Sequence, residues 1–369
     1  MSFFVGAISG TSIDGLDVAL IEVAEERVRL IQGKTFQFPN SLATRLGRLA
    51  NPNPNEIQAL GRAHAALGTF IGRTIGLFLD ETGIRSNDVT AVGSHGQTVR
   101  HFPSGVEAFS LQIGDASRIA EVTGIDTVAD FRSRDIAAGG EGAPLVPDFH
   151  RRLFHSTASD RVVLNIGGIA NVTTLPAREP DSCAGFDTGP GNGLIDAYMQ
   201  KKFSQRYDRN GSIASSGQIH PALLAQLMSD EWLQHQPPKS TGKEHFNYEY
   251  VQNAIRAAVV QLDDADVLAT LTELTVLSIR DAIAKWCFRS GELVVCGGGR
   301  LNAYLMQRLA KSCPSFHVMP CESLDVDGDS VEAAAFAYLA YLHVNGKTGN
   351  VPQVTGAKGA RVLGCLYPA

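Results

Sequence analysis

The stretch FFVGAISGTSIDGLDVALIEV, residues 3–23, decides the fold of this chain because it reads as two apolar strands joined by a glycine-rich turn. The strands are Phe3–Ile8 and Leu16–Val23, and the turn between them is SGTSIDG. Glycine reaches positive φ at little cost and lets main-chain N–H groups converge on an anion. The stretch therefore predicts a strand-turn-strand hairpin that can hold a phosphate.

The same shape returns later in the chain. Residues 162–166 and 170–175 are apolar and flank the turn NIGGIAN, which gives an internal repeat with a period of about 155 residues. That period is far too long for a solenoid. A third glycine-rich turn, CGGGRLN at residues 296–302, follows another apolar run. The order and spacing of the three turns predict a nucleotide held between two related half-domains.

Length and charge narrow the class of protein. A chain of 369 residues exceeds what one core usually supports and predicts two domains. The 32 basic and 38 acidic residues leave a net charge of −6, without a basic block, which argues against nucleic acid as a partner. No apolar run is long enough for a membrane span, and the amino terminus lacks a signal-peptide pattern. We therefore expect a cytoplasmic protein that does not bind a membrane.

Hydrophobic periodicity predicts an α/β protein. Apolar residues recur at helical spacing from Ile57 to Phe78, and Gly83 is placed to end that helix. The chain from residue 350 onward is expected to return to the first domain and to add edge strands there. The predicted strands are residues 3–8, 16–23, 28–38, 89–92, 109–113, 125–129, 162–175, 293–296, 351–354 and 360–366. The other predicted helices are residues 187–202, 221–227, 248–262, 266–288, 303–311 and 330–343.

The first turn carries groups suited to a nucleotide. Thr11 and Ser12 can donate hydroxyl hydrogens to phosphate oxygens. Asp14 is a hard oxygen ligand that suits Mg²⁺, directly or through water. The alternative is an ordinary β-hairpin turn with Asp14 and Gly15 at its tip. A second such hairpin favours the phosphate interpretation, because two hairpins that face each other form a clamp.

The third turn lies after a predicted strand and before a predicted helix. Main-chain amides and a helix N-terminus at that place can receive an adenosine or a phosphate. The turn matches neither the dinucleotide-binding fingerprint nor a Walker loop, since no GKS or GKT follows. A tight strand-to-helix connection without a ligand is the alternative.

Three further segments supply polar side chains. FDTGPGN, residues 186–192, places Asp187 ahead of a rigid turn, where it can act as a general base or merely cap the following helix. The segments SHGQT (94–98) and DFRSRD (130–135) are expected as loops that orient a polar sugar or acid, although His95 can equally be a structural histidine. Glu332 either caps a helix or reaches the ligand.

Taken together, these strings resemble the anhydro-N-acetylmuramic acid kinase family, and the resemblance runs nearly end to end. The segment HFNYEYV, residues 245–251, departs mildly from the family pattern. The motifs that carry the resemblance are SGTSIDGLD (9–17), GSHGQT (93–98), LQIGD (111–115), DFRSRDIAAGGEGAPLVP (130–147), LNIGGIANVT (164–173), GFDTGPGN (185–192), PPKSTGKEHFN (237–247) and CGGGRLN (296–302).

The resemblance implies an α/β fold of two RNase H-like (actin-like ATPase) domains around a nucleotide and sugar cleft. We place the first domain at residues 1–130 plus 350–369 and the second at residues 131–349. The implied reaction opens 1,6-anhydro-N-acetylmuramic acid with water and phosphorylates its 6-oxygen from MgATP, as a step of peptidoglycan recycling. The family also implies a bacterial cytoplasmic enzyme that forms a homodimer.

By resemblance, Asp187 is the base that activates water. The implied substrate contacts are His95, Gln97, Arg132 and Glu332, and Asp14 is the candidate Mg²⁺ ligand. Another sugar or acid kinase is the nearest alternative, and a non-catalytic ATP-driven switch is a more distant one. The candidate ATP-binding residues are Gly10, Thr11, Ser12, Ile13, Asp14, Gly15, Leu16, Asp17, Gly167, Gly168, Gly297, Gly298 and Gly299.

Overall fold

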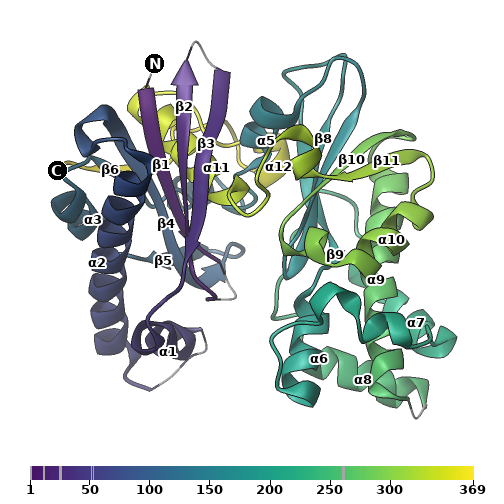
Figure 1. Cartoon of the computed structure of the whole chain (residues 1–369). Coiled ribbons are helices and arrows are strands. Elements are labelled where there is room, and N and C mark those ends of the chain that lie inside the picture. The colour runs from purple at the N-terminus through teal and green to yellow at the C-terminus, as the bar shows by residue number, and fades with distance from the viewer. Residues whose placement is uncertain (1, 11–12, 25–26, 51, 53, 260–261) are drawn as a thin grey trace. The chain divides into compact units, whose positions relative to one another are not determined.

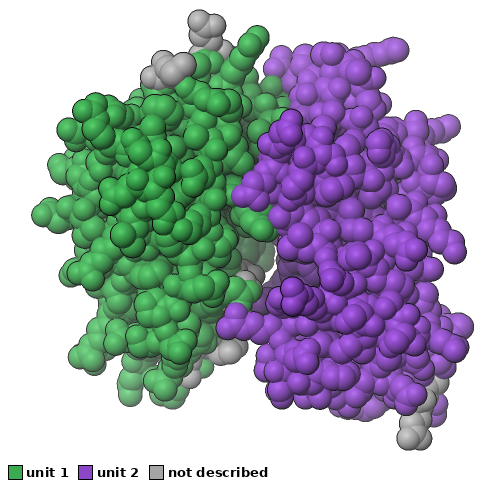
Figure 2. Space-filling view, viewed as in Figure 1, with its two compact units in different colours: residues 1–153, 329–369 green, residues 154–328 purple. Residues whose placement is uncertain are grey.

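The computed structural model describes residues 2–10, 13–24, 27–50, 52, 54–259 and 262–369 (Figure 1). The chain separates into two compact units, which Figure 2 shows in two colours. Unit 1 consists of residues 1–153 and 329–369, and unit 2 consists of residues 154–328.

Unit 1 contains a mixed sheet with the strand order β12-β6-β4-β1-β2-β3, to which β5 is added by pairing with β4. β1 pairs antiparallel with β2 but parallel with β4, and β4 pairs parallel with β6. The strands are β1 (Ser2–Ser9), β2 (Leu16–Ala24), β3 (Arg27–Phe36), β4 (Val89–Phe102), β5 (Phe109–Ile113), β6 (Thr127–Ala129) and β12 (Cys365–Tyr367).

Unit 2 repeats this pattern in a sheet with the order β11-β10-β7-β8-β9. β7 pairs antiparallel with β8 and parallel with β10, and β10 pairs parallel with β11. Read from β3 and from β9, the two sheets share one order and one set of strand directions over five strands, which is the RNase H-like order. The strands are β7 (Arg161–Ile166), β8 (Ile169–Leu175), β9 (Ala184–Pro190), β10 (Gly291–Cys296) and β11 (Phe316–Pro320).

Helices cover the sheets. In unit 1 these are α1 (Asn40–Leu49), α2 (Glu56–Thr82), α3 (Ala116–Thr123), α4 (Ser133–Ala137), α11 (Val331–Val344) and α12 (Pro352–Thr355), and α5 (Pro147–Phe154) ends at the unit boundary. In unit 2 they are α6 (Gly193–Phe203), α7 (Pro221–Met228), α8 (Tyr248–Ala258), α9 (Asp264–Trp286) and α10 (Ala303–Ser312).

Strand alternation places two different helices on the two faces of the first sheet. Val5 and Ala7 of β1 share a buried apolar cluster with residues of α2 such as Ile71. The intervening residue Gly6 faces α11, where a methyl group on it would lie 1.8 Å from the carbonyl oxygen of Ala333. Successive side chains of a strand point to opposite faces, so α2 and α11 lie on opposite sides of the sheet.

Most of the predicted elements are confirmed. The first hairpin, the repeat hairpin of β7 and β8, and the α2 helix that ends at Gly83 with positive φ all lie where the sequence places them. The α/β class with two sheets is likewise confirmed. The sequence reading missed β9 and β11 as strands.

Four expectations were wrong. DFRSRD is not a loop throughout, because its residues 133–135 begin the helix α4. SHGQT is part of the long strand β4 and not a loop, because parallel pairing to β1 and antiparallel pairing to β5 extend that strand. The helix expected at residues 187–202 starts at Gly193, since the preceding residues pair with β8 as β9. Residues 352–355 form the short helix α12 and not a strand.

The contact-based units also differ from the boundaries expected from the sequence. Those boundaries stay a prediction, but residues 131–153 and 329–349 have most of their contacts within unit 1. The reason is α11, which packs on β1, β2 and β4. A helix pattern in the sequence does not show which sheet its apolar face will cover. No helix within the described residues is long and apolar enough to cross a membrane.

The close contact of α11 with the sheet predicts a large effect of a single methyl group. We expect Gly6→Ala to destabilise the protein by about 1–3 kcal/mol, because the new Cβ has no space beside Ala333. The matched control is Gly76→Ala on α2, where no atom lies within 4 Å of the added Cβ. That change is expected to stabilise by about 0.5–1 kcal/mol through helix propensity. Urea unfolding midpoints compare the three proteins, and an unchanged midpoint for Gly6→Ala contradicts the close packing.

Candidate active site

In unit 1 the first glycine turn lies beside the middle of β4. Ile8 and Ser9 at the end of β1 pair with Gly96 and Gln97 of β4. Ile13 has a φ of 59° and donates its N–H to the carbonyl oxygen of Gly10 at 3.1 Å. Parallel pairing thus brings the predicted phosphate turn and SHGQT together.

The residues of this turn have different environments. Asp14 is exposed, whereas Gly15 and Leu16 are buried. Asp17 accepts a hydrogen bond from the hydroxyl of Thr35 at 2.6 Å. The predicted ligand groups of Thr11 and Ser12 lie outside the described residues.

In unit 2 the other two glycine turns are in contact with each other. Cys296 at the end of β10 pairs with Asn165 of β7, so the chain after each strand leaves the sheet at the same end. A methyl group on Gly297 would lie 2.4 Å from Oδ1 of Asn165, and one on Gly299 would lie 2.4 Å from Cγ2 of Ile166. The structure therefore brings the turn at Gly167 and Gly168 together with the turn at residues 297–299.

The start of α6 is bound to the first of these turns. The N–H groups of Gly191 and Gly193 donate to the carbonyl oxygen of Gly168, both at 3.0 Å, and that of Asn192 donates to Gly167 at 2.8 Å. A Cβ on Gly191 would lie 2.3 Å from the Gly167 oxygen, so glycine is required there. These amides are engaged by the turn and hold it in place.

Arg300 holds the glycine turn at residues 297–299 through hydrogen bonds of its side chain. Its guanidinium donates through Nε to Glu322 at 2.6 Å and through Nη1 to the carbonyl oxygen of Gly297 at 3.0 Å. The side chain is 4 % exposed. The sequence reading gave this arginine no role, although its position directly after three glycines is a signal that could have found it.

Asp187 lies on β9, the edge strand of the second sheet. Its carboxylate Oδ2 accepts the N–H of Thr241 at 2.9 Å, and its own N–H donates to the carbonyl oxygen of Lys239 at 3.1 Å. The N-cap of α6 is Asn192, five residues further on, so Asp187 does not cap that helix. A register shift between β8 and β9 next to Asp187 marks a bulge, which re-aims a side chain.

His95 is a buried residue at a second bulge, where β4 shifts register against β1. Its Nδ1 lies 3.1 Å from the carbonyl oxygen of Gly96 and therefore carries the proton, which leaves Nε2 to accept from Nε of Arg132 at 3.0 Å. Burial, and then the charge of Arg132, hold the pKa of His95 well below its usual value. The imidazole is neutral and both its nitrogens are engaged within the protein.

Gln97 is also buried and bonded internally. Its Oε1 accepts the hydroxyl of Ser9 at 2.5 Å, and its Nε2 donates to the carbonyl oxygen of Thr98 at 3.2 Å. Two of the four predicted sugar contacts, His95 and Gln97, therefore have their polar atoms bonded to other groups of the protein in this structure. Their role in contacting the sugar stays a prediction.

Arg132 and Glu332 are the charged members of this group. Arg132 also donates through Nη1 to the carbonyl oxygen of Gly142 at 2.7 Å. Burial lowers the pKa of Arg132 to about 10, against the opposing effects of Glu332 and Asp135. Even so, the guanidinium is charged at neutral pH.

Glu332 lies in the first turn of α11 and its side chain is exposed. The pKa of its carboxyl is raised, first because the surrounding protein displaces water and then because Asp17 carries a like charge, while Arg132 acts the other way. The pKa effects show that Asp17, Arg132 and Glu332 share one electrostatic environment.

The fold class is now clear: two sheets of RNase H-like order, each with glycine turns at the end of its first strand. The model of the family described as anhydro-N-acetylmuramic acid kinase matches residues 2–369. The chain belongs to this family.

Individual relatives agree with this assignment. The anhydro-N-acetylmuramic acid kinase of Shewanella denitrificans is 45 % identical over 367 residues, covering 100 % of this chain and 98 % of that protein. That of Coxiella burnetii is 42 % identical over 364 residues, covering 99 % and 97 %. Among solved structures, the activator of 2-hydroxyisocaproyl-CoA dehydratase from Clostridium difficile is similar with a TM-score of 0.45 and 12 % identity, over 95 % of this chain and 99 % of that one.

The neutral state of His95 predicts a loss of stability in mild acid. A histidine whose pKa is lowered by folding contributes stability above its unfolded pKa of about 6.5, and this contribution is lost as the pH falls below that value. Protonation would also put a second cation beside Arg132. We expect the thermal midpoint of the wild type to fall between pH 7 and pH 5, and to fall less in His95→Gln, whose amide oxygen accepts from Arg132 without titrating.

The same two proteins compared at pH 8 give the cost of the substitution itself, independent of titration. Calorimetry at pH 8, 7, 6 and 5 separates the two effects. An identical pH dependence in the variant and the wild type contradicts a neutral, buried His95.

Proposed function

We propose that this protein is an ATP-dependent kinase that opens 1,6-anhydro-N-acetylmuramic acid and phosphorylates its 6-oxygen, as a step in the recycling of peptidoglycan. The observation that carries the proposal is that the family model matches residues 2–369. The carboxylate of Asp187, which is held by a hydrogen bond from the N–H of Thr241, adds support. The products are N-acetylmuramic acid 6-phosphate and ADP.

Asp187 is proposed as the general base. It accepts a proton from water, whose oxygen forms a bond to the anomeric carbon of the sugar while the bond from that carbon to the 6-oxygen breaks. The freed 6-oxygen then attacks the γ-phosphorus of ATP, and the bond to the β-phosphate oxygen breaks to release ADP. Water, the sugar and ATP are the only reactants that these two steps consume.

The glycine turns are proposed to bind the triphosphate. Their role is to present main-chain N–H groups to phosphate oxygens from Gly10–Asp17, from Gly167 and Gly168, and from residues 297–299. The support is that unit 2 brings two of these turns into contact and fixes them through Arg300 and the start of α6.

Sugar contacts are proposed for the charged residues Arg132 and Glu332. His95 and Gln97 are proposed as further sugar contacts. Arg132 presents a guanidinium that suits the carboxylate of a muramic acid. The hydrogen bond that Arg132 donates to Nε2 of His95 holds this guanidinium in place.

Magnesium is proposed as the metal that accompanies ATP. Asp14 fits it chemically, because an exposed carboxylate at the tip of the phosphate turn offers the hard oxygen donor that Mg²⁺ prefers. No group of three or more histidine, cysteine or acidic side chains within the described residues forms a metal site by itself. When bound, Mg²⁺ neutralises charge on the phosphates. We also propose a homodimer in the bacterial cytoplasm.

The base assignment predicts the outcome of a conservative change. Asp187→Asn is expected to lower both ring opening and phosphorylation by at least about a thousandfold, because the amide keeps the shape of the side chain but cannot accept the proton. Mass spectrometry of the product formed in ¹⁸O-labelled water measures both events, with label at the anomeric hydroxyl and phosphate at the 6-oxygen.

Asp80→Asn, which changes an exposed carboxylate on α2, is the matched control and is expected to behave like the wild type. Normal turnover by Asp187→Asn would remove this residue from the role of base. Activity on N-acetylglucosamine or acetate in place of the anhydro sugar would indicate another kinase, and ATP hydrolysis that ignores every sugar would indicate a switch.

The metal assignment predicts a shift in Mg²⁺ dependence. Chelation by EDTA is expected to abolish turnover, and Asp14→Asn to raise the Mg²⁺ concentration needed for half-maximal rate by about tenfold, since one charged oxygen donor is lost. A coupled ADP assay across a Mg²⁺ titration measures this. An unchanged titration curve for Asp14→Asn would contradict the assignment.

A further inference from the structure

A short segment of the PPKSTGKE motif lies against the strand that carries Asp187. Among the strands of the described residues, β9 is the outermost one of its sheet, so no other strand pairs with one side of its main chain. The carbonyl oxygen of Lys239 accepts the N–H of Asp187 on that side at 3.1 Å. The segment Lys239–Thr241 is therefore attached to the edge of the sheet at the residue proposed as the base.

The same segment also binds the carboxylate. The N–H of Thr241 donates to Oδ2 of Asp187 at 2.9 Å. A carboxylate is planar, so holding one oxygen while the main chain is held at Lys239 fixes the direction of the other oxygen as well. A hydrogen bond to the charged form also favours ionisation, which a general base requires.

Lys239 anchors the segment in the protein interior. Its side chain is buried, with Nζ donating to the carbonyl oxygen of Leu233 at 3.1 Å and lying 4.3 Å from the centre of the Trp232 ring. Burial lowers the pKa of Lys239 to about 8, with Asp187 acting to raise it and Lys285 of α9 acting to lower it. A buried cation with these two contacts is expensive to place and is unusual for a simple loop.

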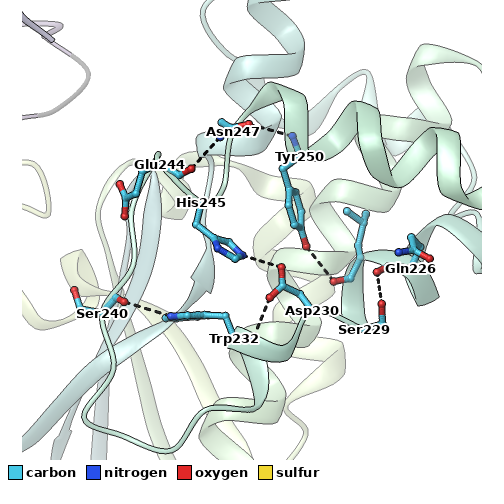
Figure 3. A network of polar contacts seen from close by, with 10 residues as sticks. Gln226, Ser229, Asp230, Trp232, Ser240, Glu244, His245, Asn247 and Tyr250 are labelled. Carbon is cyan, nitrogen blue, oxygen red and sulfur yellow. Dashed lines mark hydrogen bonds and ion pairs between the residues drawn. The ribbon is translucent and has the colours of Figure 1, made fainter. Parts of the chain in front are cut away.

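A polar network holds the flanks of the segment, as Figure 3 shows. The indole Nε1 of Trp232 donates to the carbonyl oxygen of Ser240 at 3.3 Å, and Asp230 accepts the N–H of Trp232 at 2.9 Å (Figure 3). The other carboxylate oxygen of Asp230 lies 2.8 Å from Nε2 of His245. The residues on both sides of Lys239–Thr241 are thus tied to one aspartate.

We propose that Lys239–Thr241 is a positioning segment that holds the Asp187 carboxylate in one orientation and in its ionised form, with Lys239 as its buried anchor. Neither residue need touch the substrate. The inference deepens the proposed function, since it rests on Asp187 as the base.

The first test removes the hydrogen-bond donor. Thr241→Pro lacks the N–H, whereas the control Thr241→Ala keeps it and loses only the side-chain hydroxyl and methyl groups. We expect Thr241→Pro to lower kcat by about tenfold to a hundredfold, as for a lost hydrogen bond to a charged group, with little change in the KM for ATP. The acid limb of the kcat profile should move to higher pH, because the carboxylate loses a bond that favours its charge. Thr241→Ala should match the wild type in both.

The second test changes the anchor residue Lys239. It tests the positioning role even if Thr241→Pro fails to fold. Lys239→Met removes the charge and keeps much of the apolar stem, while Lys239→Arg keeps the charge. We expect Lys239→Met to lower kcat and raise the pH of the acid limb, and Lys239→Arg to restore part of both. Thermal unfolding of each variant confirms that folded protein is compared.

The results separate this inference from the proposed function. If Asp187→Asn is inactive while Thr241→Pro or Lys239→Met keeps the wild-type kcat and acid limb, the positioning role is overturned and the base stands. If Lys239→Met loses stability and lowers kcat without moving the acid limb, the segment is only structural and the proposal is also overturned. Retained activity in Asp187→Asn would instead overturn the proposed function.

Discussion

Each sheet depends on the mixed pairing of its first strand. β1 pairs antiparallel with β2 on one side and parallel with β4 on the other, and β7 pairs in the same way with β8 and β10. Parallel strands run in the same direction, so their C-terminal ends lie at the same edge of the sheet. The turn after β1 therefore lies beside β4, and the turn after β7 lies beside the turn after β10. This single constraint brings the first glycine turn to Gly96 and Gln97, and brings Gly167 and Gly168 to residues 297–299.

Around these turns, charged and polar side chains mostly hold other groups in place. Asp135 is fully buried and accepts hydrogen bonds from the N–H of Gly142 at 2.8 Å, from Asn350 at 2.6 Å and from Thr355 at 2.8 Å. It thereby ties the loop that carries Arg132 to the last part of the chain. Arg300 likewise holds the glycine turn at residues 297–299, and the segment at Lys239 holds Asp187. A buried charge is tolerated where several hydrogen bonds satisfy it.

Much of the fold could be predicted from local patterns. The hairpin of residues 3–23, its repeat at residues 162–175, and the helix that stops at Gly83 are all decided by periodicity and by glycine, which act within a few residues. β9 was missed because FDTGPGN reads as a turn followed by a helix, and only pairing with β8 makes it a strand. SHGQT was expected as a loop for a similar reason, since its glycine at φ 70° suits a turn but is accommodated within β4 by a bulge.

The sequence by itself determined the class of fold, the three glycine turns and the candidate residues, because composition, spacing and backbone preference are local properties. Tertiary structure alone decided that His95 and Gln97 have their polar atoms engaged within the protein, that α11 belongs with the first sheet, and that Lys239 and Thr241 hold Asp187. Those outcomes depend on which strands pair and which faces are buried. The bonds of His95 with Arg132, of Gln97 with Ser9 and of Asp187 with Thr241 join residues that are 37, 88 and 54 positions apart in the chain.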